Sequence, residues 1–87
     1  MSDPVRVPIG PEIDLHTFEP RDVAHLVEDY VNAAAEAGFD EVRLVHGRGR
    51  GVQRGIVQAA LDRHERVLEF WDDPTSHLGA TIARIRR

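Results

Sequence analysis

The sequence contains no cysteine and no lysine, and it has few aromatic residues. Without cysteine the chain can form neither a disulfide bond nor a thiolate metal site. Without lysine it cannot carry the P-loop, whose lysine contacts nucleotide phosphates. No apolar run approaches the roughly 18–20 residues of a membrane-spanning helix, and residues 1–10 lack the apolar core of a secretory signal. We therefore expect a cytoplasmic protein with no membrane partner.

Charge is distributed unevenly along the 87 residues, although the net charge is −4. Residues 1–42 carry ten acidic residues and two arginines, whereas residues 43–87 carry nine arginines and five acidic residues. Four of these arginines lie between Arg43 and Arg54, with no acidic residue among them. A local basic segment of this kind can bind an anion even when the whole molecule is acidic.

The hydrophobic pattern predicts alternating strands and helices after an extended, proline-containing arm over residues 1–11. Residues 12–16 alternate between apolar and polar side chains, which predicts a short strand. Pro20 suits the first turn of a helix, and apolar residues at helical spacing continue this helix towards Gly38, its expected C-cap. Residues 41–46 alternate again and predict a second strand.

The second half of the chain predicts a helix over residues 52–64 and strands over residues 66–71 and 80–85, the last two joined by a polar loop. The inward face of this helix is predicted to consist of Val52, Ile56, Val57, Ala60 and Leu61. The order β-α-β-α-β-β predicts an α/β fold with two helices and a mixed four-stranded sheet. Strand–helix alternation favours mainly parallel pairing, and the short last loop predicts that the final strand runs antiparallel to the third.

Two histidines and a carboxylate follow the first two predicted strands. Asp14 and His16 end the first strand, and His46 ends the second. Because ligands gather at the carboxyl ends of parallel strands, we expect these side chains to share one rim of the sheet. His46 is a candidate general base or acid, since imidazole titrates near neutral pH. His16 would share the proton transfer or bind phosphate, and Asp14 would orient a histidine or hold a divalent ion such as Mg²⁺ or Mn²⁺.

A loop of alternating glycine and arginine follows His46. The glycines allow the backbone to approach a phosphate, the arginines suit phosphate oxygens, and the helix that follows favours an anion at its N-terminus. The predicted phosphate-binding residues are Gly47, Arg48, Gly49, Arg50, Gly51, Arg54, Thr17 and Arg21. Val52 stands where the dinucleotide-binding fingerprint requires a third glycine, so we expect no nucleotide cofactor.

Each of these residues also has a structural interpretation. A histidine at the end of a strand often serves only as a hydrogen-bonding group, and Asp14 can tie down the adjacent turn. The arginines can form a solvated loop, and the glycines can serve only as turn residues. The combination of all these groups at one predicted rim favours phosphate binding.

The motifs IDLH at 13–16, VRLVHGRG at 42–49 and GATIARI at 79–85 resemble those of the Smr (small MutS-related) domain family, including its stand-alone members. Thr17 departs from the glycine that many members have there. The resemblance covers residues 12–87 and implies a two-layer α/β sandwich like the C-terminal domain of translation initiation factor three. It also implies binding to branched or duplex nucleic acid and, as in several members, cleavage of DNA or RNA. The residues that it implicates are Asp14, His16, His46, Gly47 and Gly49.

We therefore predict a structure-selective endonuclease that nicks DNA or cleaves RNA, by means of the DLH motif and the HGRG loop. One alternative is a module that binds branched or duplex nucleic acid without cleaving it. Another is a protein-interaction domain whose glycine loop contacts an acidic partner. The sequence decides neither whether a metal ion takes part nor whether the protein is a monomer or a homodimer.

Overall fold

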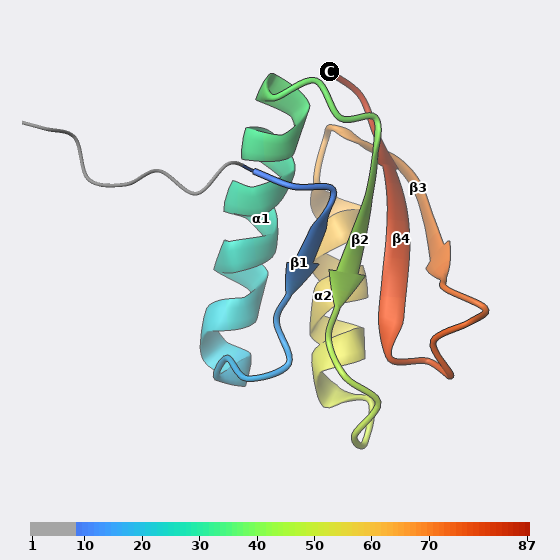
Figure 1. Ribbon diagram of the computed structural model, residues 1–87. Coiled ribbons are helices and arrows are strands. Elements are labelled where there is room, and N and C mark those ends of the chain that lie inside the picture. Colours follow the sequence, from blue (N-terminus) through green and yellow to red (C-terminus); the bar gives the residue numbers. More distant parts are fainter. Residues whose placement is uncertain (1–8) are drawn as a thin grey trace, which may run out of the picture.

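Two helices pack on one face of a four-stranded sheet in the computed structural model, which describes residues 9–87 (Figure 1). The elements are β1 (Glu12–Asp14), α1 (Pro20–Glu36), β2 (Glu41–Val45), α2 (Val52–Arg63), β3 (Val67–Asp72) and β4 (Ala80–Ile85). The predicted element order and the two-layer architecture are confirmed. Most of the arm predicted over residues 1–11 lies outside the described residues.

The strand order in the sheet is β1-β2-β4-β3, and it corrects the expectation of mainly parallel pairing. Only β1 and β2 are parallel, while β4 lies between β2 and β3 and runs antiparallel to both. Burial explains this order. Four of the six residues of β4 are buried, which suits a central strand, whereas none of the six in β3 is buried, which suits an edge. The predicted antiparallel pairing of β3 and β4 is confirmed.

Helix α1 begins at Pro20, as predicted, and the apolar stripe faces the sheet. Its buried residues are Val23, Val27, Tyr30, Val31, Ala34 and Ala35. The C-cap is Ala37 rather than Gly38, and Gly38 follows it with a φ of +96°. A left-handed residue directly after the C-cap is a common way for a helix to end, and glycine adopts that conformation without steric cost.

Helix α2 begins at Val52, as predicted, but differs from the prediction in two other respects. It ends at Arg63, because His64 is already extended. Val52 does not face inward but is 57% exposed, since the first turn of the helix projects beyond the edge of the sheet. Val57, Ala60 and Leu61 are buried as expected, and Ile56 is partly buried against the core.

The predicted strands are correct to within two residues. Strand β1 ends at Asp14 rather than at His16, because the chain turns there, although Leu15 remains fully buried. Strand β2 ends one residue early, at Val45, and β3 is displaced by one residue to Val67–Asp72. Strand β4 has the predicted limits.

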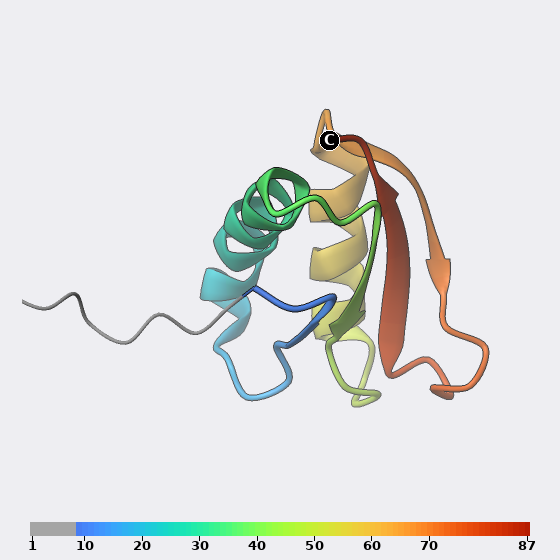
Figure 2. The ribbon, with the colours of Figure 1, turned by 45° about the horizontal axis from the view of Figure 1, so that its top comes forward.

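The core lies between the sheet and the helices, and three loops lie together along one edge of it (Figures 1 and 2). They are the β1–α1 loop (15–19), the β2–α2 loop (46–51) and the β3–β4 loop (73–79). The chain's C-terminus lies at the opposite edge (Figure 1). Among residues 9–87, neither helix is long and apolar enough to cross a membrane.

Candidate functional site

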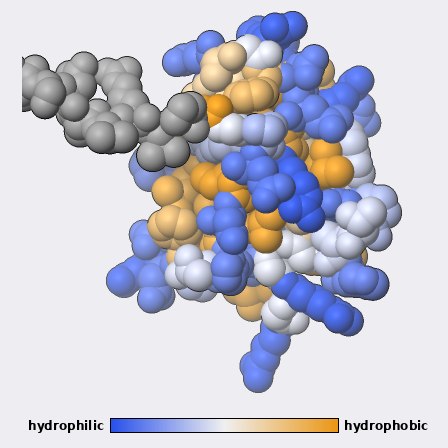
Figure 3. Space-filling view, viewed as in Figure 1, coloured by the Kyte–Doolittle hydropathy of each residue, from blue (hydrophilic) through white to orange (hydrophobic). Residues whose placement is uncertain are grey.

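A cleft of about 380 Å³ opens beside the β2–α2 loop. Its lining consists of His16, His46 and residues 47–53. Strongly hydrophilic side chains project into solvent at this edge of the molecule, where Figure 1 places the β2–α2 loop (Figure 3). The rim predicted from the sequence therefore exists, and it joins the ends of β1 and β2 to the start of α2.

Asp14 and His16 form a solvent-exposed pair at the end of β1. Asp14 Oδ1 accepts hydrogen bonds from the backbone N–H of His16, at 3.0 Å, and from its ring Nδ1. Both side chains are 54% exposed. The bond from the ring, followed by the bond from the backbone, lowers the pKa of the Asp14 carboxyl from its ordinary value of 3.8. Because Nδ1 donates to Asp14, the lone pair of a neutral ring lies on Nε2, and within residues 9–87 Nε2 has no hydrogen-bond partner.

His46 has the opposite environment at the end of β2. The residue is 3% exposed, and both of its ring nitrogens have partners. Nδ1 lies 3.0 Å from the carbonyl oxygen of Gly47, and Nε2 lies 2.9 Å from the hydroxyl of Thr81. A carbonyl oxygen can only accept, so Nδ1 carries the proton and a neutral ring accepts at Nε2 from Thr81. His46 thus joins the start of the glycine loop to β4.

A chain of hydrogen bonds continues from Thr81 to helix α2. Gln58 donates to the Thr81 hydroxyl at 3.1 Å and to Asp72 Oδ1 at 2.9 Å. Arg54 completes the network with two bonds to Asp72, at 2.8 and 2.7 Å, and these bonds lower the pKa of Asp72. Arg54, a predicted phosphate ligand, therefore has an intramolecular partner.

The sequence reasoning missed three members of this network. They are Gln58, Asp72 and Thr81. Nothing in the sequence pointed to a role for Gln58, since glutamine is common on exposed helix faces. The one available hint was Thr81, because a hydroxyl within the apolar alternation of a central strand needs a buried partner.

Two close contacts fix the glycine loop to its neighbours. A Cβ atom added at Gly47, whose φ is +83°, would lie 3.2 Å from Cβ of His16, so only glycine fits there without displacing the β1–α1 loop. The carbonyl oxygen of Gly79 accepts the backbone N–H groups of both His46 and Gly47, each at 3.0 Å. The β1–α1 and β3–β4 loops therefore hold the start of the β2–α2 loop from two sides.

Arg48 and Arg50 are the exposed arginines of the cleft, and neither forms an ion pair within the described residues. The N-cap of helix α2 beside them is Gly51, whose φ is +81°, and the helix has no side-chain cap and no acidic residue in its first turn. The two arginines therefore lie beside the first backbone N–H groups of α2, which no side chain caps, and both features favour an anion. Thr17 and Arg21 are exposed near this edge, but they do not line the cleft.

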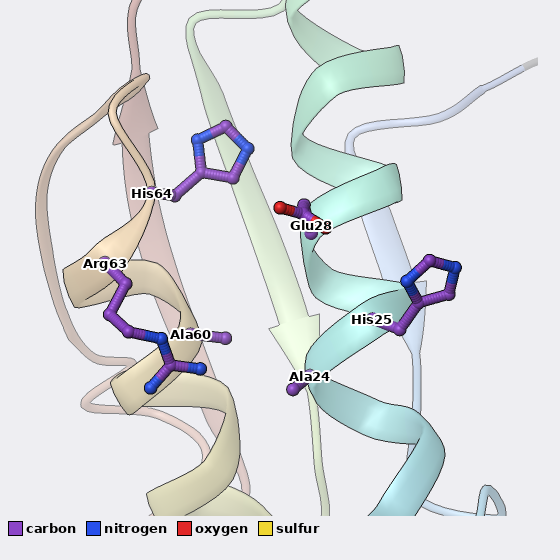
Figure 4. Close-up of a pocket in the computed structure, with 6 residues that line it drawn as sticks. All are labelled: Ala24, His25, Glu28, Ala60, Arg63 and His64. Atoms are coloured by element: carbon purple, nitrogen blue, oxygen red, sulfur yellow. The ribbon is translucent and has the colours of Figure 1, made fainter.

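A second, smaller cavity of about 170 Å³ lies between the two helices, away from the rim (Figure 4). Its lining consists of Ala24, His25, Glu28, Ala60, Arg63 and His64. Among residues 9–87, the one group of three side chains placed to ligate a metal ion adjoins it: His25, Glu28 and Asp29, all exposed. Asp14 belongs to no such group, and Arg63 places a positive charge beside the cavity.

Comparison with known proteins agrees with the fold. The crystal structure of the Smr domain of Thermus thermophilus MutS2 superposes with a TM-score of 0.84 and 30% sequence identity, over 90% of this chain and 100% of that domain. YdaL, a stand-alone small MutS-related protein from Escherichia coli, gives a TM-score of 0.80 at 20% identity. It covers 88% of this chain and 65% of YdaL, and it supports the fold alone.

Sequence comparison identifies relatives named Endonuclease MutS2. The protein from Symbiobacterium thermophilum is 36% identical over 81 residues, and that from Helicobacter pylori is 28% identical over 74 residues. These matches cover 90% and 85% of this chain but 10% of each relative, so the chain spans about a tenth of their length. The family profile described as the Smr domain matches residues 13–86. The chain therefore belongs to the Smr domain family.

Proposed function

We propose that the chain binds nucleic acid at the rim and cleaves a phosphodiester bond with the Asp14–His16 pair. The observation that carries the proposal is the position of His16. Its ring is held by Asp14 at the edge of a cleft that also contains exposed arginines. An imidazole that a carboxylate orients can transfer the proton in phosphodiester cleavage, and a phosphate-binding loop beside it can stabilise the charge that develops.

The β2–α2 loop would hold the phosphate. Arg48 and Arg50 have no acidic partner among the described residues, so their charge is available to a ligand. The first N–H groups of α2 add a favourable dipole, since Gly51 supplies no side-chain cap. The net charge of −4 makes tight generic binding to nucleic acid unfavourable, so binding will be local and sensitive to salt.

His16 would act through Nε2. It would accept the proton of the attacking oxygen, which is a water molecule or, in RNA, the adjacent 2′-hydroxyl. Asp14 would keep the ring in the orientation that exposes Nε2 and would stabilise the imidazolium that forms. The charge that develops on the phosphate oxygens would face Arg48 and the loop. The leaving oxygen departs with the bonding electron pair and then takes a proton from the imidazolium or from water.

In this proposal His46 is a supporting residue rather than the proton-transfer group favoured by the sequence pattern. Its two ring nitrogens are engaged by Gly47 and Thr81, and it is buried. Its removal would release the glycine loop from β4. Relatives that bear the name Endonuclease MutS2 support cleavage as the activity, whereas the alternative is a module that binds nucleic acid without cutting it.

A combined cleavage and binding assay tests the proposal. Labelled branched DNA, duplex DNA and structured RNA are incubated with the protein in Mg²⁺, Mn²⁺ or EDTA, beside a His16→Ala protein purified identically. We expect cutting by the wild type alone. Binding without cutting by the wild type would favour the non-catalytic module, and the absence of both would contradict the proposal.

A double variant separates phosphate binding from chemistry. Replacing Arg48 and Arg50 with alanine should weaken binding to every substrate. It should also lower the slope of log affinity against log salt by about one per arginine. Arg63→Ala is the matched control, because Arg63 is exposed but lies on the helix side of the molecule. An unchanged salt slope in the double variant would contradict the role given to the loop.

A further inference from the structure

Two consecutive residues at the tip of the β3–β4 loop have a left-handed backbone. His77 has a φ of 52° and Leu78 a φ of 68°, and they are the only non-glycine residues with positive φ within the described part of the chain. Side chains clash with the backbone in this conformation, so glycine would be less costly at both positions. Strain of this kind persists only where the surrounding structure enforces it, and it concentrates at active sites and ligand-binding sites.

The rest of the loop enforces this conformation. Asp73 Oδ1 accepts the backbone N–H of Thr75 at 2.9 Å and its hydroxyl at 2.8 Å. The carbonyl of Ser76 accepts the N–H of Gly79, and its hydroxyl oxygen accepts the N–H of Ala80. None of these bonds uses the side chain of His77 or Leu78. Both side chains are exposed, Leu78 to 51%, and neither forms a hydrogen bond or ion pair within residues 9–87.

The strained tip lies directly against the proposed phosphate-binding loop. Gly79 follows Leu78, and its carbonyl holds the N–H groups of His46 and Gly47. A Cβ atom added at Gly79 would lie 3.8 Å from the backbone nitrogen of Arg48. A ligand whose phosphate sits on the glycine loop would therefore have His77 and Leu78 beside it.

Exposed apolar side chains also flank the other side of the glycine loop. Val52 lines the cleft and is 57% exposed, and Phe18 is 44% exposed. Phe18 belongs to the same edge, because its carbonyl accepts a 2.6 Å hydrogen bond from Gln53 in the first turn of α2. This edge of the molecule thus carries exposed arginines on the glycine loop and exposed apolar side chains on both sides of that loop. Paired duplex presents its backbone to such an edge, whereas unpaired nucleotides present both a phosphate and the apolar face of a base.

We propose that His77 and Leu78 contact unpaired bases of the strand whose phosphates lie on the 48–51 loop. The inference rests on the proposed nucleic-acid binding and adds the preferred feature of the ligand, which is unpaired nucleotides beside the bound phosphate. Glycine at either of these strained positions would remove this contact.

Leu78→Gly tests the inference without the risk of unfolding, because glycine relieves the left-handed strain. The variant should raise Tm by a few degrees. Affinity is measured for two probes, a short duplex with a central run of unpaired thymines and the same duplex fully paired, each as DNA and as RNA. We expect the wild type to favour the first probe. Leu78→Gly and Leu78→Ala should lower that affinity by about three- to tenfold and leave the paired duplex within about twofold.

Leu68→Ala is the matched control. Leu68 is 56% exposed on β3, near the opposite edge of the sheet, and its replacement should change neither affinity. If the Leu78 variants keep the wild-type preference for unpaired thymines, the inference is wrong while the proposed binding stands. If the wild type binds neither probe, the proposed function fails and the inference fails with it.

Discussion

His16 and His46 occupy similar places in the chain, two residues after β1 and one residue after β2, yet their environments are opposite. The side chain of His16 is 54% exposed, and its one ring partner is Asp14, two residues away. His46 is 3% exposed and bonds to a residue of another strand. The sheet order explains the difference. Strand β1 is an edge strand, whereas β4 pairs with β2 and brings Thr81 against His46.

The comparison shows that the neighbouring strand decides whether a histidine near a strand end stays exposed or has both ring nitrogens engaged within the fold. His16 keeps one ring nitrogen without a partner among the described residues, while His46 uses both of its ring nitrogens to hold the β2–α2 loop. Substitutions at four residues test this contrast and the loops around it.

The largest expected effect is on cleavage, after removal of the His16 ring. His16→Ala should lower the cleavage rate by about 100- to 10,000-fold, which is the usual contribution of a positioned acid or base. Tm should stay within about a degree of the wild-type value, because the side chain is exposed. His25→Ala, another exposed histidine, should cut normally. Normal cutting by His16→Ala would remove the residue from the chemistry.

His46→Ala should instead act on stability. It removes a buried ring and leaves the Thr81 hydroxyl without its acceptor, which should lower the free energy of unfolding by about 2–3 kcal/mol. Urea denaturation measures the loss. Cleavage should fall in proportion to the disorder of the glycine loop and recover partly at low temperature. Unchanged stability with complete loss of cleavage would assign the chemical role to His46.

A smaller loss of stability is expected from changes at Thr81, the hydrogen-bond partner of His46. Thr81→Val keeps the shape but removes the hydroxyl that serves both His46 and Gln58, so unfolding should become easier by about 1–2 kcal/mol. Thr81→Ser retains the hydroxyl and should lose less. Thermal melting of the two variants compares them directly, and a larger loss in Thr81→Ser than in Thr81→Val would mean that the methyl group matters rather than the hydrogen bonds.

The smallest expected effect is on stability at low pH, through Asp73 in the β3–β4 loop. The hydrogen bond from Arg43, followed by those from Thr75, lowers the pKa of Asp73 from 3.8 to about 2. The folded protein therefore favours the carboxylate. The stability that this provides is complete above the ordinary pKa and is lost as pH falls from about 4 towards 2. Melting temperatures across this range should fall less steeply for Asp73→Asn, and parallel curves would contradict the assignment.

Much of the fold follows from local patterns in the sequence. Proline at the start of α1, its apolar stripe and the alternation in β4 each specify an element within about two residues. The pairing of strands is not local, because β4 is the last strand of the chain and enters between two earlier ones. That insertion also buries His46, which is the histidine that the sequence pattern favoured for proton transfer.

The site was predictable as a location but not as a set of contacts. The ends of β1 and β2 and the glycine loop do gather at one rim. Arg54 and Asp72 are 18 positions apart in the chain, so no local sequence pattern predicts that they pair. Only the arrangement of α2 against β3 and β4 creates the network that occupies Arg54, Gln58 and Thr81.

The most direct test of the contrast between the two histidines is NMR of their ring nitrogens, recorded without and with an oligonucleotide that binds. The account predicts a neutral His46 ring with its proton on Nδ1 and resonances that stay in place when the oligonucleotide is added. It predicts that the Nε2 resonance of His16 moves on binding, while those of His25 do not. A His46 ring that responds to the oligonucleotide beside a silent His16 would contradict it.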